Sequence, residues 1–530
     1  MLLLATKGNL FKTGLIKILL TGCICLLYFG RAFNDIEPRP LGDGVEYVLM
    51  TEAFYNHFTP DIRNDDVKSF LNAHYFNTNG KSLYKYMYFN DLFTYLSSPK
   101  KLGDNKHGVF TAKNGKSFSY HFFFYSLLNV PGRFIADFFD LDPLKIYQVL
   151  NAALIVITVS FILFGLQGLW HPVLMSLCFV FSSNYWYLGW PHTEIYSASL
   201  VTIAMFLFFF KNKYYIPVFL LSLAAVQNQP IVILIAFIVI AMIYKKGFSL
   251  LMIFKLFCNC LPVLFPILFY YFHFGSLNLI KDSGFLSIEN ISLTRIFGFY
   301  FDINQGMILT IPLILFTYLF LLFNSARKMI TKKENFQIHF LLPVFLIIMT
   351  CVVSTMKHWN PGQAIINRYE CWFAPVIVIH TFFLISDFQI IYKSVLLNYF
   401  FLTQTFTTLF HQQYNIHDWG QHQHTHLAKW FIEQHPELYN PDPEIFRNRT
   451  SNATGSVDRK IIMYLSETRF CKLMVHQSSL DNLKSYGVSE KDIANYKNNL
   501  KYINDWGYIN RKDFKTNFSF EQLKKIYKPH

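Results

Sequence analysis

The stretch GLIKILLTGCICLLYFGRAF, residues 14–33, is long and apolar enough to cross a bilayer as one helix. A helix needs roughly 17–25 mostly apolar residues to span ~30 Å of hydrocarbon. Comparable runs recur at 144–167, 248–274, 306–323 and 338–356. A membrane β-barrel would instead show alternating segments of ~10 residues. The sequence therefore predicts an all-α polytopic membrane protein.

Composition supports this prediction. Of the 530 residues, 53% are hydrophobic and 15% are charged, with a net charge of +14. Soluble domains carry about 25% charged residues. We attribute the positive charge to basic cytoplasmic loops and a basic tail. No basic groove with interleaved aromatic residues is visible, so we expect no nucleic-acid partner. The eight cysteines show no CxxC pair and no spacing typical of a disulfide framework.

Three lysines, Lys7, Lys12 and Lys17, lie within or ahead of the first apolar run. Positive charge in short loops marks the cytoplasmic side. The N-terminus is therefore predicted inside, and residues 34–142 are predicted to form a large external loop. The first run resembles a signal peptide, but the residues after Phe29 offer no small-residue cleavage site. We expect an uncleaved first helix.

Residues 120–139, YHFFFYSLLNVPGRFIADFF, are nearly long enough to span but are interrupted at Pro131. If they do not span, the short basic loops at Lys211, Lys245 and Arg327 all fall on the cytoplasmic side, as the positive-inside rule requires. If they span, all these loops fall outside. We therefore predict that 120–139 is re-entrant or lies at the membrane interface.

The first helix and ten later crossings give about eleven predicted spans. The later ones are expected at about 144–167, 172–189, 194–210, 214–227, 230–244, 250–273, 305–323, 338–356, 371–387 and 391–410. Residues 1–411 would form the membrane domain, and 412–530 a small external domain. The composition is typical of a bacterium, which suggests the inner membrane.

Six predicted external segments beside helix ends hold polar residues that a simple loop would not need. They are 42–46 (GDGVE), 190–194 (WPHTE), 227–229 (QNQ), 301–306 (FDINQG), 357–362 (KHWNPG) and 367–370 (NRYE). Ionisable groups at membrane depth are costly and usually functional. We therefore predict one polar cavity on the external face.

Asp43 and Glu46 are spaced i, i+3, so a helix beginning at Asp43 would place both on one face, with Tyr47 beside them. Gly42 and Gly44 would let the backbone turn sharply and a ligand approach closely. The alternative is that Asp43 only caps this helix, because Asp followed three residues later by Glu resembles a capping box.

The other polar residues also have two interpretations each. Arg368 could grip a phosphate with two hydrogen bonds, or extend toward the interface as a helix-end arginine. Lys357 and His358 have the same two interpretations. His192 and Glu194 could orient a substrate hydroxyl or bind a metal, although a lone His-x-Glu is weak evidence for a metal.

A histidine tract, HQHTH, places His422, His424 and His426 at alternate positions. This spacing suits a strand face, and no acidic or cysteine partner keeps a standard metal spacing. We favour a hydrogen-bonded surface run over a metal site.

Taken together, these residues resemble the GT-C superfamily of membrane glycosyltransferases, which use polyprenyl-phosphate sugars and include the protein O-mannosyltransferases and aminoarabinose transferases. The likeness covers about residues 14–410. Besides the acidic motif after the first helix, it rests on three stretches: SYHFFFYSLLNVP (119–131), FDINQGMILTIPLIL (301–315) and KHWNPGQAIINRYECWFAPV (357–376). Many members carry adjacent acids or Asp-x-Asp, whereas here the two acids flank two other residues.

The resemblance implies that an acceptor hydroxyl attacks the sugar with inversion and that the lipid phosphate leaves. Asp43 would be the general base and Glu46 the second choice, with Arg368, Lys357 and His358 holding the phosphate. The implied partners are a polyprenyl-phosphate-linked sugar donor, a glycan, lipid-linked glycan or protein acceptor, and membrane lipids. No cofactor is certain, and a divalent metal stays a candidate. The remaining residues expected around the substrates are Tyr120, His121, His192, Glu194, Gln227, Asn228, Asp302, Gln305, Asn367 and Tyr369.

Three other functions remain open. A transporter or flippase would show broken helices and midplane charges, whereas here the polar residues gather near one face. A lipid-linked glycan polymerase or ligase typically uses a large late loop with arginines and a histidine. A non-catalytic scaffold would leave the polar segments unexplained.

Overall fold

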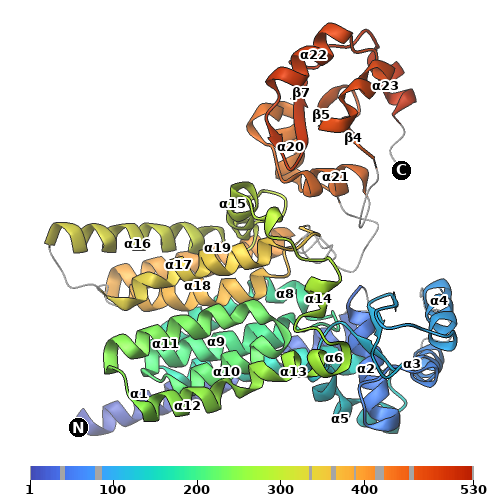
Figure 1. Cartoon of the computed structure of the whole chain (residues 1–530). Helices are drawn as coiled ribbons and strands as arrows, with labels where there is room; N and C mark the ends of the chain where they lie inside the picture. Colours follow the sequence, from blue (N-terminus) through green and yellow to red (C-terminus); the bar gives the residue numbers. More distant parts are fainter. Residues whose placement is uncertain are drawn as a thin grey trace. The chain divides into compact units, whose positions relative to one another are not determined.

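The structure is a computed structural model that describes residues 2–35, 42–77, 86–332, 337–359, 366–386, 390–411, 423–452 and 459–527 (Figure 1). It is 69% helix and 6% strand. The chain divides into two compact units. The first unit comprises residues 1–284, 311–349 and 369–412, and the second comprises 285–310, 350–368 and 413–530.

Six helical stretches among the described residues are long and apolar enough to cross a membrane. They are Lys12–Asn34, Lys145–Gly165, Glu194–Lys211, Gln229–Lys246, Leu250–Phe274 and Pro312–Thr331. Four shorter apolar helices accompany them: Trp170–Val180, Tyr215–Gln227, Ile338–Ser354 and Glu370–Ile385. These helices agree with an integral membrane protein. The total of about eleven crossings and the orientation stay predictions.

The apolar helices of the first unit follow one another along the chain. In order they are α1 (Leu2–Gly30, continued by the π-helical turn Arg31–Asp35), α6 (Lys145–Gly165), α7 (Trp170–Val180), α9 (Glu194–Lys211), α10 (Tyr215–Gln227), α11 (Val232–Lys246), α12 (Leu250–Cys260), α13 (Leu264–Phe274), α16 (Pro312–Lys332), α17 (Leu342–Ser354), α18 (Glu370–Ile385) and α19 (Ile390–His411). Helix α9 lies among α6, α10 and α18 and is buried on most sides. Its small residues, such as Ala198, Thr202 and Ala204, let neighbouring backbones approach closely.

Two predicted crossings are interrupted. The stretch 172–189 is divided into α7 and the short α8 (Asn184–Tyr187), and Ser182 and Asn184 both bond to the carbonyl of Phe179 at the break. The stretch 250–273 contains the 3₁₀ turn Leu261–Val263 between α12 and α13. Pro262 lacks an N–H and cannot continue the α-helical ladder, which explains this second break.

Between α1 and α6 the described part of the chain forms a subdomain of four helices and a small sheet. The elements are α2 (Gly44–His57), α3 (Asn64–Asn77), α4 (Tyr86–Ser97), β1 (Asn105–Lys106), β2 (Val109–Thr111), β3 (Ser117–Ser119) and α5 (Phe124–Phe138). The strands form an antiparallel sheet in the order β1-β2-β3, with Phe110 opposite Phe118. The sequence reasoning did not predict these strands, because none exceeds three residues.

Helix α5 covers most of the segment predicted to be re-entrant or interfacial. One face, including Tyr125, Ser126 and Asn129, is buried, and the helix packs on α2. The opposite face leaves Phe134 and Phe138 exposed at 46% and 80%. A helix with one anchored face and one exposed apolar face suits a position at a membrane surface. The interfacial position itself stays a prediction.

A buried ion pair fastens α5 to α2. The Arg133 Nε donates to Glu52 Oε1 at 2.6 Å, and the two side chains are only 3% and 1% exposed. Ser69 donates to the other oxygen of Glu52 at 2.9 Å. Replacing Arg133 by alanine should lower the free energy of unfolding by about 3–5 kcal/mol, because it leaves a buried carboxylate without its cation.

Denaturant unfolding of the purified protein in detergent, followed by tryptophan fluorescence, measures this loss. The control is the double variant Arg133→Leu with Glu52→Leu, which removes both charges together. We expect it to recover much of the lost stability, since buried ion pairs are often replaceable by apolar residues. A double variant as unstable as the single one would contradict this account.

The second unit contains a four-stranded antiparallel sheet in the order β4-β5-β7-β6. Its strands are β4 (Ile461–Leu465), β5 (Phe470–His476), β6 (Tyr502–Ile503) and β7 (Trp506–Asn510). Side chains alternate between two apolar clusters: Met463 and Leu473 belong to one, and Ile462 and Met474 to the other. This period of two means that both faces of the sheet are covered.

Helical segments supply those covers. One cluster includes residues of η9 (Gln477–Tyr486) and α22 (Glu490–Asn499). It also includes Tyr527, which directly follows α23 (Phe520–Ile526). The other cluster involves α20 (His426–Gln434) and α21 (Pro443–Ser451), with the 3₁₀ turn Pro436–Leu438 between them. Smaller segments of the chain before α16 are α14 (Leu279–Asp282), η4 (Ile288–Asn290), α15 (Leu293–Phe301) and η5 (Met307–Leu309).

Arg295 joins the three chain segments of the second unit. It lies on α15, is 4% exposed and donates to Asp442 Oδ2 at 3.1 Å. Its guanidinium also donates to the carbonyl oxygens of Ser354 and Met356 at 3.1 and 2.7 Å. Residues 285–310 and 350–368 therefore fold together with the C-terminal region.

Candidate functional site

The acidic motif lies at the N-terminal end of α2, as predicted. Gly42 has φ +52°, a left-handed conformation that glycine adopts without strain, and Asp43 occupies the N-cap position. The Asp43 side chain makes no capping hydrogen bond to the helix. The helix-cap alternative therefore does not explain the orientation of its carboxylate.

Three side chains distant in sequence surround the Asp43 carboxylate. The Tyr120 hydroxyl donates to Oδ1 at 3.3 Å. His192 Nε2 and His121 Nε2 lie 3.5 and 3.8 Å from Oδ2. The Asp43 side chain keeps 22% of its surface exposed. A carboxylate that is oriented on two sides and open on another can contact a ligand.

Glu46 lies one helical turn further on and is enclosed. It is 3% exposed, and its Oε2 accepts hydrogen bonds from Ser119 and from His121 Nδ1, the latter at 3.1 Å. Gly108, at φ +78°, passes so close that an added Cβ would lie 2.0 Å from Glu46 Oε1. Burial raises the pKa of Glu46 to about 7, against the lowering influence of His121. Glu46 thus orients His121 and does not open to solvent.

A similar arrangement lies on the other side of Asp43. His192 Nδ1 is 3.3 Å from Glu194 Oε1, and the indole N–H of Trp372 donates to Glu194 Oε2. The His192 ring stacks on Trp190, with centroids 4.1 Å apart and planes 14° apart. The site is therefore a row of alternating carboxylates and imidazoles, in the order Glu46, His121, Asp43, His192 and Glu194. We call these five residues the carboxylate–imidazole row.

The helix ends beside the row confirm that several predicted polar segments meet. Asn228, at the end of α10, donates to Ser197 at 2.6 Å and to Thr193 at 3.3 Å, both near the start of α9. Helices α9 and α10 therefore form a hairpin that returns the chain to the same end. Gln227 donates to the carbonyl of Phe122 at 2.9 Å.

Tyr47 packs between the two histidines of the row. Its ring centroid is 5.4 Å from that of His121 and 5.1 Å from that of His192. Burial raises the pKa of its phenol well above the usual value, so the hydroxyl stays protonated. Tyr47 therefore fills the space behind the row and limits how far either imidazole can move.

The row also offers ligands for a small cation. One ligand atom each from Asp43, Glu46 and His121 lies within 4.8 Å of the others. These residues would suit a divalent ion, with Asp43 as the ligand open to substrate.

The remaining predicted site residues belong mainly to the second unit. Asp302 is 7% exposed; it accepts from the backbone N–H groups of Asn304 and Gln305 and from the Tyr439 hydroxyl, and burial raises its pKa to about 6. Gln305 donates to the carbonyl of Trp359 at 3.1 Å. These bonds shape a loop, and a substrate contact by Asp302 or Gln305 stays a prediction.

Five more predicted residues lie on either side of residues 360–365, which are outside the described part of the chain. Lys357 is exposed, and the Nδ1 of the 40%-exposed His358 lies 3.6 Å from Glu444 Oε1. Asn367 is buried and Arg368 is half-buried, both in the second unit, while the buried Tyr369 begins the next segment of the first unit. Their proposed role toward a phosphate stays a prediction.

The histidine tract differs from its predicted form. His424 is 3% exposed and is bonded to Asn304 at 3.0 Å and to Thr450 at 2.9 Å. His426 begins helix α20, so the tract is not a strand face. His424 is therefore a hydrogen-bonded histidine, as favoured, but it is buried and not on the surface. His422 lies outside the described residues.

Sequence reasoning missed four contributors to the site: Ser119, Gly108, Trp190 and Trp372. Ser119 directly precedes the selected Tyr120, and Trp190 lies two positions before the selected His192; both stood within quoted stretches. Gly108 and Trp372 gave no local signal, since their roles depend on contacts across 62 and 178 positions of the chain.

No family model, no curated protein and no solved structure matches this chain. The function must therefore be argued from the chemistry of the site itself.

The raised pKa of Glu46 predicts a pH-dependent stability. Between its ordinary value of 4.5 and about 7, the folded protein keeps a proton on Glu46 that the unfolded chain releases. The free energy of unfolding should therefore fall as the pH rises through this window, by roughly 3 kcal/mol at about 1.4 kcal/mol per pH unit. Glu46→Gln should lack this component, which urea unfolding at pH 5 and pH 7.5 measures. Identical pH dependence in the two proteins would refute it.

Proposed function

We propose that this chain is an integral-membrane glycosyltransferase that moves a sugar from a polyprenyl-phosphate donor to a hydroxyl of a glycan, a lipid-linked glycan or a protein. The observation that carries the proposal is the carboxylate–imidazole row, with the open Asp43 at its centre and the apolar helices beside it. The resemblance to GT-C enzymes adds the substrate class.

Asp43 is the better of the two candidates for the general base. Its carboxylate is oriented by Tyr120 and remains partly exposed, so an acceptor hydroxyl can approach within hydrogen-bond distance. Glu46 already accepts two hydrogen bonds in a closed pocket. We therefore assign proton abstraction to Asp43 and the orientation of His121 to Glu46.

The imidazoles of His121 and His192 suit a reaction in which negative charge moves from the Asp43 carboxylate to the leaving phosphate. As Asp43 takes a proton from the acceptor, the attacking oxygen bonds to the anomeric carbon and the bond to the phosphate oxygen breaks. His121 and His192 contact the base, and each is backed by a second carboxylate. Fixed donors around a leaving phosphate stabilise its charge in a dry site. Arg368, Lys357 and His358 remain the predicted phosphate ligands.

The test of this function is a donor panel. Membranes containing the protein would be incubated with radiolabelled polyprenyl-phosphate sugars, with and without EDTA. We expect one donor to be consumed, with label appearing in a hydroxyl-linked product. An EDTA-sensitive reaction would assign a divalent ion to Asp43, Glu46 and His121. Failure to consume any donor of the panel would overturn the proposal.

A second function, proton-coupled transport of a lipid-linked substrate, has one observation in its favour. A hydrogen-bonded chain leads from the exposed Gln337 into the interior of the first unit: Gln337 to His339 at 2.6 Å, His339 to His380 at 3.1 Å and His380 to Tyr318 at 3.1 Å. Ionisable chains among membrane helices often relay protons. In liposomes with an internal pH dye, a transporter would acidify the lumen and lose this with His380→Leu. A glycosyltransferase would keep donor consumption in that variant.

A further inference from the structure

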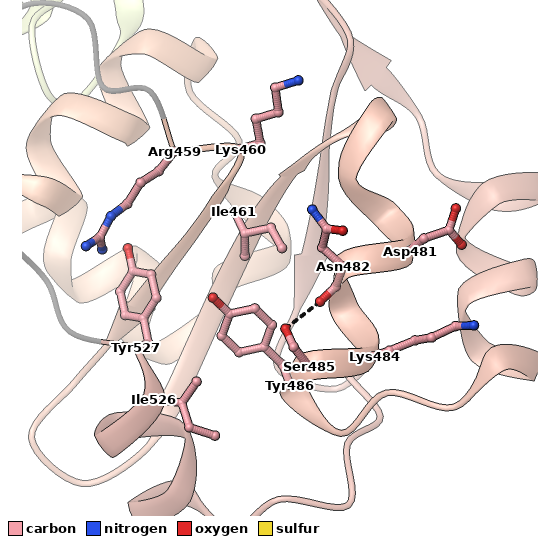
Figure 2. A pocket seen from close by; sticks show the side chains of 10 residues that line it. All are labelled: Arg459, Lys460, Ile461, Asp481, Asn482, Lys484, Ser485, Tyr486, Ile526 and Tyr527. Atoms are coloured by element: carbon pink, nitrogen blue, oxygen red, sulfur yellow. Dashed lines mark hydrogen bonds between the residues drawn. The ribbon is translucent and has the colours of Figure 1, made fainter.

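A cavity of about 690 Å³ lies in the second unit, between the residues before β4, segment η9 and the end of α23 (Figure 2). This volume falls within the range of ~300–1,000 Å³ that is typical of small-molecule sites. Tyr486 and Tyr527 line its centre, and Figure 2 shows their hydroxyls directed toward Arg459. The lining of this cavity contains none of the five residues of the carboxylate–imidazole row.

The lining carries excess positive charge. Arg459, Lys460 and Lys484 contribute three cations and Asp481 one carboxylate. The Lys484 Nζ lies 2.6 Å from Glu490 Oε1, so the positive charge of the lining comes mainly from Arg459 and Lys460. The Asp481 carboxylate is held by Lys497, whose Nζ lies 2.9 Å from both oxygens. An anionic ligand would therefore meet attraction and little repulsion in the cavity.

One buried polar group in the lining lacks a partner. Tyr527 is 4% exposed, and within the described part of the chain its hydroxyl has no hydrogen-bond partner. Buried hydroxyls are nearly always hydrogen-bonded, because a buried hydroxyl without a hydrogen bond lowers the stability of the fold. The Arg459 guanidinium lies 5.5 Å from the centre of the Tyr527 ring. This pair would offer a neutral donor and a cation to the same ligand.

Polar and aromatic groups complete the recognition chemistry. Asn482 and Ser485 line the cavity from η9, and the Ser485 hydroxyl donates to the carbonyl of Asn482 at 2.7 Å, which leaves the Asn482 amide side chain for other contacts (Figure 2). A sugar ring can stack its C–H face on a tyrosine while its hydroxyls bond to amides and hydroxyls. An acid group on the sugar would add the cation contacts.

We propose that this cavity binds a short anionic segment of the acceptor glycan, one to three sugar rings carrying a carboxylate or a phosphate. Its glycan identity rests on the proposed function, whereas the presence of an anionic-sugar site does not. Because the cavity belongs to the same polypeptide as the carboxylate–imidazole row, binding there would raise the local concentration of the acceptor chain.

Calorimetry on the full-length protein in detergent tests this, with three probes: trigalacturonic acid, neutral maltotriose and inorganic phosphate. We expect trigalacturonic acid to bind at least about tenfold more tightly than either other probe, because only it combines rings with charge. Arg459→Ala with Lys460→Ala should weaken binding by about tenfold or more, and Tyr527→Phe by about threefold to tenfold. The matched control is Arg511→Ala with Lys512→Ala, an exposed Arg-Lys pair outside the lining, which should leave binding unchanged.

Three outcomes would overturn the proposal. Equal binding of maltotriose would mean that charge is not recognised, and equally tight phosphate would mean a simple anion site. Equal weakening by the control pair would mean that only net charge matters. Asp43→Asn serves to separate the two proposals, because it should keep trigalacturonate binding. Binding without any donor consumption would refute the enzyme and leave the cavity assignment standing.

Discussion

Replacing Asp43 by asparagine should reduce sugar transfer by about 10²- to 10⁴-fold, the usual contribution of a positioned general base. Asparagine keeps the size of the side chain and can still accept from Tyr120, but it cannot take a proton. The hydrogen bonds that orient the site therefore persist while the chemistry stops. The measurement is the initial rate of label transfer from whichever donor the panel identifies, at matched protein level.

The control for this variant is Asp65→Asn. Asp65 lies on α3, is 87% exposed at its side chain and pairs with Lys68 one turn further on, so its change should leave the rate untouched. Thermal unfolding of both variants should match the unmodified protein. If Asp43→Asn keeps more than about a tenth of the rate, proton abstraction falls to another group. The same result with Glu46→Gln strongly reduced would move the base to Glu46.

The second large effect is expected from Gly108→Ala. The new Cβ would lie 2.0 Å from Glu46 Oε1 and 2.9 Å from the Tyr120 ring, so Glu46 must move. Moving it breaks its bonds to Ser119 and His121, and His121 then no longer faces Asp43. Misplacing a catalytic group by about 1 Å costs on the order of 100-fold in rate, and we expect a loss of that size.

Gly115→Ala provides a matched comparison in the same small sheet region. Gly115 has φ +76°, nearly the same strained conformation as Gly108 at φ +78°, but nothing lies within 4 Å of its added Cβ. Both variants should lose about 1 kcal/mol of stability from backbone strain, and only Gly108→Ala should lose activity. Equal losses of transfer in the two variants would show that the backbone strain, and not Glu46, is responsible.

The positions of the apolar helices could be predicted because length and hydropathy are local properties. Helices α6, α9 and α10 begin and end within about two residues of their expected limits. The break at Leu261–Val263 could have been anticipated from Pro262, but a single proline does not distinguish a kink from a turn. The β1-β2-β3 sheet could not be predicted in this way. Its pairing is local, but strands of two or three residues are too short to show an alternating pattern.

The site was predictable in its residue types and not in its pairings. Asp43, Glu46, His121, His192 and Glu194 were all selected as ionisable residues beside helix ends, and they lie together. What the sequence could not provide was the order of the row, because His121 and His192 reach Asp43 from segments far from it in the sequence. The difference in exposure between the buried Glu46 and the partly exposed Asp43 is what distinguishes their roles, and this difference could not be read from the sequence.

The buried contacts of Arg295 also determine when the second unit can fold during protein synthesis. Its partner Asp442 follows 147 positions later in the chain. At about 5–20 residues per second, a ribosome needs roughly 7–30 s to add that length. During this interval the chain that forms α16, α17, α18 and α19 is also made, while the Arg295 cation on α15 still lacks its carboxylate. The second unit can close only after these four helices have been synthesised, so its folding reports that this part of the chain is complete.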